Sequence, residues 1–161
     1  MIIIGIDPGA SGAIAVRYTN LHPDNIEVIK LDQTETDIAN VLTQYTPQRG
    51  VNGAFAYLES VHSMTKQWVA SSFKFGQSYG FLRGLLIALK IPFETVTPQK
   101  WQKAMGCMSR GDKNVTKAKA QQLFTRIKVT HAIADALLLA EYGRRIRAGE
   151  FNATERTDDA I

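Results

Sequence analysis

The feature that most constrains the fold is an apolar run near the start of the chain that stops at a carboxylate. Residues 2–6 read Ile-Ile-Ile-Gly-Ile, and Asp7 follows them directly. A β-branched run without helical spacing is typical of a buried strand. Pro8 and Gly9 then indicate a turn, and residues 13–18 return as the predicted second strand of a hairpin. The chain is therefore expected to open with a buried antiparallel pair that carries an acid beside its turn.

The rest of the chain alternates between short strands and amphipathic helices. Apolar and polar residues alternate over 26–31, which predicts a third, half-buried strand, and two more strand-like runs fall at 53–59 and 93–96. Helices are predicted at 34–45, at about 71–90, from Pro98 onward, at 115–127 and at 131–146. Three antiparallel strands followed by alternating helices and strands favour an α/β fold. We expect a mixed five-stranded sheet with helices on both faces, a ribonuclease-H-like arrangement.

Length and composition set further bounds. The 161 residues, 45% of them hydrophobic, are enough for one core, so we expect a single domain over residues 1–149 and a polar tail over 150–161. The single cysteine, Cys107, excludes an intrachain disulfide and favours a reducing compartment. No basic leader precedes the first apolar run, and no later run is long enough to span a bilayer. We therefore expect a cytoplasmic protein, in the host cell if a phage encodes it, without membrane contact.

Positive charge is concentrated in one third of the chain. The formal net charge is +4, but residues 100–147 hold eleven Lys and Arg residues against three acidic residues. Such a segment favours binding to a polyanion, although a solvated helical surface would show the same pattern. The residues that we expect to bind DNA phosphates there are Lys100, Lys103, Arg110, Lys113 and Lys119.

Potential metal ligands fall at the ends of predicted strands and at the start of the last helix. Asp7 and Glu59 each end an apolar strand, and His131 and Asp135 lie four residues apart, on one face of the helix. Buried carboxylates repel one another unless cations neutralise them. Carboxylate ligands favour Mg²⁺ or Mn²⁺, and three acids with an imidazole suit two such ions about 4 Å apart, as in phosphodiester cleavage.

Several of these residues also have an ordinary structural explanation. An acid after a strand is often a turn former or a surface residue, and His131 could begin its helix without binding a ligand. Trp101 lies on one helical stripe with Met105, which favours a place in the core, whereas Trp68 is a candidate for base stacking or for an interface. The Phe-rich helix at 71–90 has more apolar surface than one sheet contact needs, so we expect its surplus face to be buried in a two-fold interface.

Five segments of the chain resemble, in the same order, motifs of a known family. The first two active-site motifs of the RuvC-type Holliday junction resolvases are similar to IGIDPG at 4–9 and LESV at 58–61, and the third is similar to ADALLLA at 134–140. The family's helix after the second motif resembles FGQSYG at 75–80, and its strand-to-helix crossing resembles VTPQKW at 96–101. Together the segments extend over about residues 2–146, and the resemblance is nearest to the bacteriophage members.

The resemblance implies a ribonuclease-H-like fold, a homodimer, and paired nicking of four-way DNA junctions with Mg²⁺ or Mn²⁺. Asp7, Glu59 and Asp135 match three acidic metal ligands of the family. His131 stands in the region of the fourth ligand, which is an acid in many members and a histidine in some. Its interval to Asp135 is four residues, where the bacterial enzymes have three.

Two further positions follow from the same resemblance. Lys117 aligns with a family lysine that acts near the scissile phosphate, so it is a candidate catalytic residue. On chemistry alone, such a lysine could steady the charge of the transition state, clamp a phosphate or be solvated. His62 and Ser63 occupy the loop where bacterial members place an aromatic residue at the junction centre, so this chain lacks that aromatic residue there.

Three other functions remain open on the residues alone. The same acids would serve a nuclease that cuts flaps, forks and other branched DNA. A non-catalytic DNA-binding module would explain the basic segment but not the intact ligand set. An actin-like sugar or acetate kinase would use residues 7–12 as a phosphate loop, but it needs two such domains, and 161 residues supply one. The sequence favours a metal-dependent endonuclease that resolves four-way junctions by paired nicks.

Overall fold

The computed structural model describes residues 1–9, 11–60 and 69–151. These residues contain five strands, five α-helices and a short 3₁₀-helix at Pro47–Arg49. The strands are β1 (Ile2–Asp7), β2 (Ala13–Tyr18), β3 (Ile26–Lys30), β4 (Ala54–Glu59) and β5 (Phe93–Val96). The helices are α1 (Glu35–Thr43), α2 (Val69–Ala88), α3 (Pro98–Met105), α4 (Lys113–Leu123) and α5 (His131–Ala148).

The strands form one mixed sheet in the order β3-β2-β1-β4-β5, which confirms the predicted five-stranded sheet. β1 pairs antiparallel with β2, and β2 pairs antiparallel with β3. The pairs β1–β4 and β4–β5 are parallel, and Ile6 of β1 lies beside Leu58 of β4. Because β1 and β4 run in the same direction, the next residues, Asp7 and Glu59, end neighbouring strands at the same edge of the sheet.

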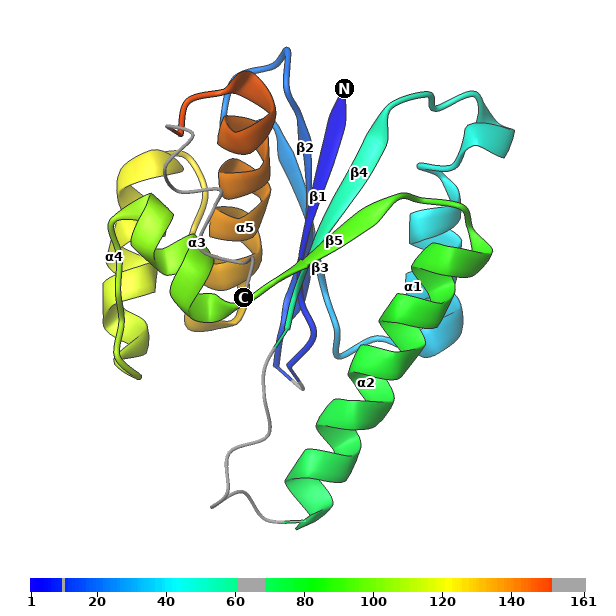
Figure 1. Cartoon of the computed structure of the whole chain (residues 1–161), viewed down its shortest axis with the longest axis horizontal. Helices are drawn as coiled ribbons and strands as arrows, with labels where there is room; N and C mark the ends of the chain where they lie inside the picture. The colour runs from blue at the N-terminus through cyan, green and yellow to red at the C-terminus, as the bar shows by residue number, and fades with distance from the viewer. Residues whose placement is uncertain (10, 61–68, 152–161) are drawn as a thin grey trace, which may run out of the picture.

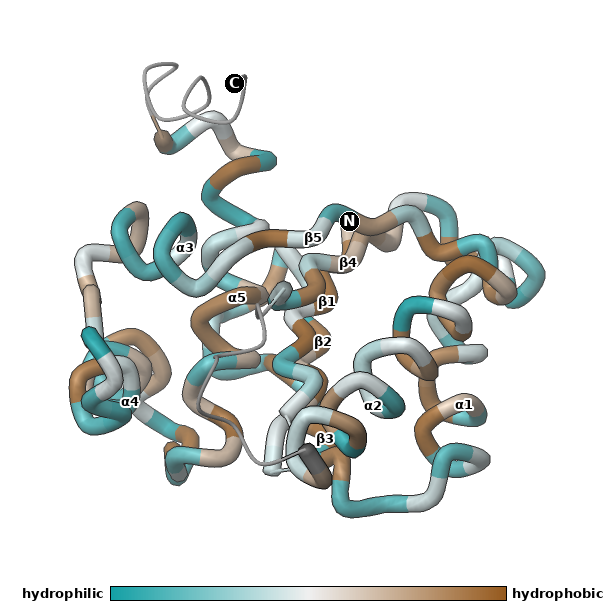
Figure 2. The backbone as a smooth tube through the Cα atoms, turned by 60° about the horizontal axis from the view of Figure 1, so that its bottom comes forward, coloured by the Kyte–Doolittle hydropathy of each residue, from teal (hydrophilic) through white to brown (hydrophobic). Residues whose placement is uncertain are grey.

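Helices cover both faces of the sheet, as predicted (Figure 1). Ile4 and Ile6 of β1 pack with α1 and α2, whereas Ile3 packs with α3, α4 and α5. The central strand β1 and its neighbours β2 and β4 are mostly apolar (Figure 2), since helices cover both faces of the sheet there. Side chains alternate between the faces of a strand, so Gly5 and Asp7 share the face of Ile3. Asp7 is therefore on the side of the sheet that α5 covers.

Helix α5 lies directly against β1 because Gly5 has no side chain. A Cβ on Gly5 would come within 2.4 Å of the Ala136 carbonyl oxygen and of the Ala140 amide nitrogen, both in the backbone of α5. Further along α5, the buried carboxylate of Glu141 pairs with the buried guanidinium of Arg17 on β2. These contacts fix how far along β1 the helix lies, and hence where its first turn meets the strand ends.

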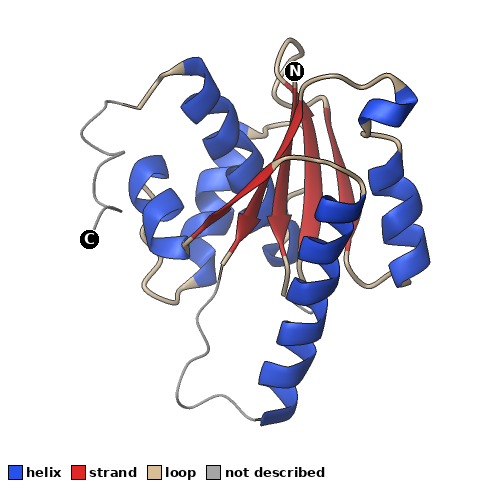
Figure 3. Cartoon of the chain, turned by 45° about the vertical axis from the view of Figure 1, so that its right-hand side comes forward, coloured by secondary structure: helices blue, strands red, loops and turns tan. Residues whose placement is uncertain are grey.

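The longest helix, α2, extends beyond the sheet. Its N-terminal half continues past the carboxyl ends of β1 and β4 (Figures 1 and 3). Phe73 and Ile87 of α2 are 66% and 62% exposed, so part of its apolar surface is uncovered in the single chain. No helix among the described residues, α2 included, is long and apolar enough to cross a membrane.

Helix α4 ends earlier than the sequence predicts, at Leu123 instead of residue 127. Phe124 leaves the helical conformation and is buried in the core. Two residues later, the Arg126 amide donates a hydrogen bond to Asp24 Oδ1 at 3.2 Å, across 102 residues of sequence. This tertiary contact holds the chain after Leu123 in a non-helical conformation. The local sequence pattern does not predict the contact. The other predicted boundaries lie within two residues of the observed ones.

Replacing Gly5 by alanine tests the close approach of α5 to β1. The added methyl group meets backbone atoms of α5, so the helix has to move away from the strand. We expect Gly5→Ala to lower the free energy of unfolding by about 1–3 kcal/mol in urea denaturation. Gly76→Ala in α2 is the matched control, because a Cβ there meets nothing within 4 Å, and alanine favours a helix. Equal stability of the two variants would contradict the close approach.

Candidate active site

The parallel pairing of β1 and β4 brings Asp7 and Glu59 together. Asp7 shares with Ile3 and Gly5 the face of β1 that α5 covers, and Glu59 shares with Tyr57 the same face of β4. Glu59 is buried, at 6% exposure, and Asp7 is half-buried. The sheet therefore places two carboxylates side by side at one edge, beneath the same helix layer.

The turn after β1 holds the Asp7 carboxylate in place. The Gly9 amide donates to Asp7 Oδ1 at 3.1 Å, and the Gly12 amide donates to the Gly9 carbonyl at 2.8 Å, which closes the turn. A Cβ on Gly12 would lie 2.1 Å from the Asp7 carbonyl oxygen, so the turn can close only around a glycine. The two glycines therefore orient Asp7.

Helix α5 supplies a third carboxylate, Asp135. The next residue, Ala136, has the carbonyl oxygen that lies against Gly5, so Asp135 is held beside the end of β1. Oδ1 of Asp135 is buried and has no hydrogen-bond partner among the described residues. A buried carboxylate oxygen without a partner costs about 1–3 kcal/mol or more, and a bound ligand is one way to satisfy it.

Burial and mutual repulsion raise the pKa values of these carboxyl groups. Burial, and next the charge of Asp7, raise the pKa of Glu59 to about 8. Burial also raises the pKa of Asp7, and the charge of Asp135 adds to the rise. The pKa of Asp135 is raised by burial, against the opposing effect of the Thr116 hydroxyl. The three acids named from the sequence are thus close enough in the fold to interact electrostatically.

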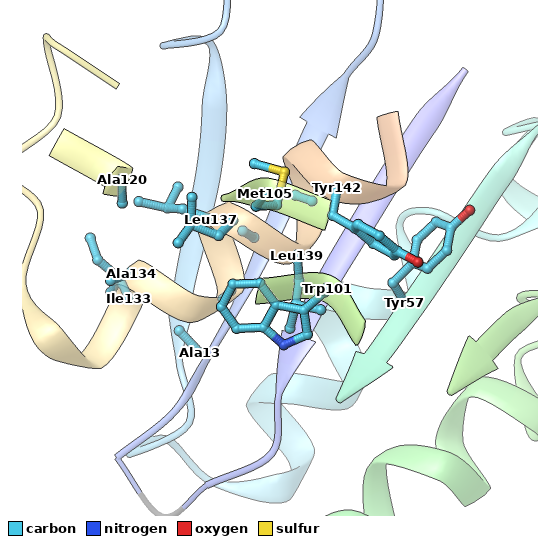
Figure 4. Packing of buried hydrophobic residues seen from close by; sticks show 14 of the residues in the cluster. Ala13, Tyr57, Trp101, Met105, Ala120, Ile133, Ala134, Leu137, Leu139 and Tyr142 are labelled. Atoms are coloured by element: carbon cyan, nitrogen blue, oxygen red, sulfur yellow. The ribbon is translucent and has the colours of Figure 1, made fainter. Parts of the chain in front are cut away.

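Trp101 donates a hydrogen bond to Glu59, a contact that sequence reasoning missed. Its indole ring is fully buried in the cluster beneath α5 (Figure 4), in agreement with its predicted core position. Nε1 of Trp101 lies 2.8 Å from Glu59 Oε1, and this bond lowers the pKa of Glu59 against the effect of burial. An indole N–H only donates, so it favours the ionised carboxylate. Nothing in the local pattern separates this tryptophan from an ordinary core residue.

Lys113, the first residue of α4, is the lysine that acts on all three acids. Its charge lowers the pKa of each of them. Lys117, the lysine that the family resemblance favours, lies one helical turn further along the same face of α4, and none of these shifts involves it. Lys113 stands at the helix start because Asp112 caps α4, accepting a hydrogen bond from the Asn114 amide at 2.9 Å.

The other basic residues are unequally available to a ligand. Lys103 and Arg110 are exposed, whereas Lys119 is half-buried and Lys100 lies 3.9 Å from Glu94. The arginines of α5 are engaged within the chain: Arg144 and Arg145 pair with Glu141 and Glu150, and Arg147 lies over the ring of Phe55. An exposed positive surface runs from α3, through the following loop, to the start of α4.

His131 begins α5 and is hydrogen-bonded to the neighbouring helix. Its ring is exposed, and Nε2 lies 3.0 Å from Asn114 Oδ1 on α4. The charge of protonated His131 lowers the pKa of Asp135, which agrees with their four-residue interval on one side of α5. The structure therefore places His131 near Asp135, with one ring nitrogen already in use.

The donor chemistry at this edge fits divalent cations. Carboxylate oxygens are the ligands that Mg²⁺ and Mn²⁺ prefer. Oδ1 of Asp135 accepts no hydrogen bond from the described residues, so it is available to bind a cation. As the side chains stand, no group of three or more His, Cys, Asp and Glu residues in the described ranges is arranged to hold a metal ion. The carboxylates are near enough for the charges of Asp7 and Asp135 to raise the pKa of Glu59.

Three residues singled out from the sequence, His62, Ser63 and Trp68, lie outside the described residues. The stacking or interface role of Trp68 stays a prediction. Ser60, just before this segment, still donates its amide to the Val96 carbonyl at 2.9 Å, so pairing between β4 and β5 is kept up to the site.

The raised pKa of Glu59 predicts how the stability of the metal-free protein depends on pH. The ordinary pKa of 4.5 in the unfolded chain becomes about 8 in the folded protein. The folded state therefore binds this proton more tightly, so the stability contributed by Glu59 is full below pH 4.5 and is lost as the pH rises through 8. Urea denaturation in EDTA should show a loss on the order of a few kcal/mol over this window.

Glu59→Gln should remove most of this pH dependence, because the amide does not ionise. Glu94→Gln is the matched control, since Glu94 is exposed on the neighbouring strand, and it should keep the wild-type slope. A metal-free wild-type protein that becomes more stable over the same window would contradict the buried position of Glu59.

Comparison with known proteins bears on the fold. No protein family model and no curated protein sequence matches the chain. The structure is similar to that of Thermus thermophilus RuvC, with a TM-score of 0.60 to its complex with a Holliday junction substrate and 0.57 to a second structure. Each match is 16% identical and covers 92% of this chain and 97% of that chain. The protein therefore has the ribonuclease-H-like fold of RuvC, as predicted, while its nearness to bacteriophage members stays a prediction.

Proposed function

We propose that this protein is a metal-dependent endonuclease that resolves four-way DNA junctions by paired nicks. The observation that carries the proposal is the meeting of Asp7, Glu59 and Asp135 at one edge of the sheet, where the charges of Asp7 and Asp135 raise the pKa of Glu59 and the charge of Asp135 raises the pKa of Asp7. The RuvC fold supports the reaction class, and the complex of T. thermophilus RuvC with a Holliday junction substrate supports the substrate class.

In this proposal the three acids would hold two Mg²⁺ or Mn²⁺ ions, and His131 is the fourth candidate ligand. When bound, such ions generate a nucleophile from water and offset charge on the leaving oxygen. The acids would then be ionised at neutral pH, because the positive charge reverses the pKa rise that burial causes. Oδ1 of Asp135 would gain a partner. Trp101 would keep one oxygen of Glu59 fixed throughout.

We assign Lys113 to the reacting phosphate. Its ammonium is exposed, at the start of α4, and its charge acts on all three carboxylates. A cation in that place would stabilise the negative charge that develops on the phosphate in the transition state. Lys117, one turn further along α4, would bind a neighbouring phosphate of the same strand.

The exposed basic residues near the site would hold the DNA backbone. Lys103, Arg110 and Lys113 lie on the surface that runs from α3 to the start of α4. Contacts with phosphates release counterions, so binding would weaken steeply as salt rises, without dependence on base sequence.

Paired nicks require two copies of the chain, one for each of two strands. We propose that the second copy covers the exposed face of α2, which carries Phe73 and Ile87. Among its 20 residues α2 has two charged side chains, Lys74 and Arg83, so little charge would be desolvated in such a contact. Helix α2 extends past the strand ends that carry the acids (Figures 1 and 3), so a two-fold contact along α2 would give a dimer with one such site in each copy.

Asp7→Asn tests the reaction, because the amide keeps the size of the side chain but not its charge. On a mobile four-way junction, wild-type protein with Mg²⁺ or Mn²⁺ should nick two symmetry-related strands. We expect Asp7→Asn to nick about 100-fold more slowly or not at all, while gel-shift binding to the junction persists. Asp32→Asn, at an exposed acid after β3, is the matched control and should cut at the wild-type rate.

Each other outcome has a definite meaning. Cleavage by Asp7→Asn at the wild-type rate would rule out the metal role of this acid. Equal nicking of flaps, forks and junctions would broaden the substrate to branched DNA in general. Binding without cleavage by wild-type protein, with either ion, would leave a DNA-binding module.

A comparison of Lys113→Gln with Lys117→Gln separates the two lysines. Under single-turnover conditions, we expect Lys113→Gln to slow nicking of bound junction by about 100-fold, because charge on the transition state loses its partner. Lys117→Gln should instead weaken binding and reduce the salt slope by about 1, with little change in the rate of the bound complex. Slower nicking of the bound junction by Lys117→Gln, with only weaker binding by Lys113→Gln, would instead assign the catalytic role to Lys117.

A further inference from the structure

We propose that Asn114 fixes the tautomer of His131, with Nε2 protonated and Nδ1 left free as the nitrogen that binds the cation. The inference rests on the proposed function, in which His131 belongs to the metal site. It identifies a positioning residue on α4 and names the ligating atom of His131, and it is carried by three hydrogen bonds around Asn114.

Asp112 holds the side chain of Asn114 in one orientation. Oδ1 of Asp112 accepts from the Asn114 backbone amide at 2.9 Å and from Asn114 Nδ2 at 3.0 Å. An ionised carboxylate can only accept hydrogen bonds, so the amide carbonyl of Asn114 in the place of Nδ2 would be repelled. The amide nitrogen and oxygen of an Asn are assigned by such partners, and here Oδ1 has to face away from Asp112.

The orientation of Asn114 decides which nitrogen of His131 carries the proton. Oδ1 of Asn114 lies 3.0 Å from His131 Nε2, and a carbonyl oxygen only accepts, so Nε2 donates. A neutral imidazole has one N–H, and Nδ1 therefore keeps its lone pair. Only the nitrogen without a proton can bind a metal ion. Reversing the Asn114 amide would give the opposite tautomer and block Nδ1.

The three residues also join the two helix starts at the site. Asp112 caps α4 directly before Lys113, and His131 is the first residue of α5, four residues before Asp135. The hydrogen bonds between Asp112 and Asn114 and between Asn114 and His131 therefore connect α4, which carries Lys113, with α5, which carries Asp135. A partner that orients a metal-binding histidine in this way typically changes metal affinity by about 10- to 100-fold.

The tautomer can be measured directly in the metal-free protein by long-range ¹H–¹⁵N NMR, at a pH where the imidazole is neutral. We expect protonated Nε2 and unprotonated Nδ1 in wild-type His131. In Asn114→Ala the ring loses its acceptor, and the tautomer ratio should fall about fivefold, toward that of a solvated imidazole. His131→Gln identifies the signals among the three histidines of the chain.

Metal affinity provides a second readout that does not depend on cleavage. In calorimetric titration of the DNA-free protein with Mn²⁺, we expect Asn114→Ala to weaken binding about 10- to 100-fold. In a His131→Gln background, Asn114→Ala should have no further effect, because Asn114 acts through His131. A residue that only stabilises the fold would weaken binding in both backgrounds.

A protonated Nδ1 in the wild-type protein overturns the assignment, and so does a tautomer ratio that Asn114→Ala leaves unchanged. If wild-type protein binds Mn²⁺ but carries the His131 proton on Nδ1, the role of Asn114 is refuted and the proposed nuclease site stands. The expected tautomer without any Mn²⁺ binding refutes the metal site itself and, with it, the role of free Nδ1. The two failures are therefore distinguishable.

Discussion

The close approach of α5 to β1 determines where the three carboxylates meet. Because Gly5 has no side chain, the backbone of α5 rests on the strand, and Asp135 in its first turns is held beside Asp7. Parallel pairing of β1 and β4 adds Glu59 at the same edge. The fold therefore holds three acids together, and burial, followed by the charge of Asp7, raises the pKa of Glu59 to about 8.

The groups around the acids offset this repulsion only in part. The Gly9 amide donates to Asp7, the indole of Trp101 donates to Glu59, and the charge of Lys113 lowers the pKa of all three acids. All three favour the ionised carboxylates, yet the pKa values stay raised and Oδ1 of Asp135 has no partner among the described residues. A chain selected for stability alone would not keep this cluster, so its retention fits a site that binds cations.

Local patterns in the sequence predicted the strands, the helices and the acids at their ends, because a run such as residues 2–7 leaves few alternatives. The contacts that depend on the assembled fold could not be predicted. Trp101 reads as a core residue and also donates to Glu59, 42 positions away in sequence. Lys113 and Lys117 share one helix face, and only packing of α4 shows which one acts on the acids. The end of α4 at Leu123 depends on a bond to Asp24.

The most direct test of shared repulsion is a double-mutant cycle on the metal-free protein, with Asp7→Asn and Glu59→Gln singly and together. Unfolding free energies would be measured in EDTA at a pH above 8, where Glu59 is ionised in the folded wild-type protein. We expect each change to stabilise the protein, and the pair to gain at least about 1 kcal/mol less than the sum. Additive effects, within about 0.5 kcal/mol, would show that these two carboxylates do not share a site.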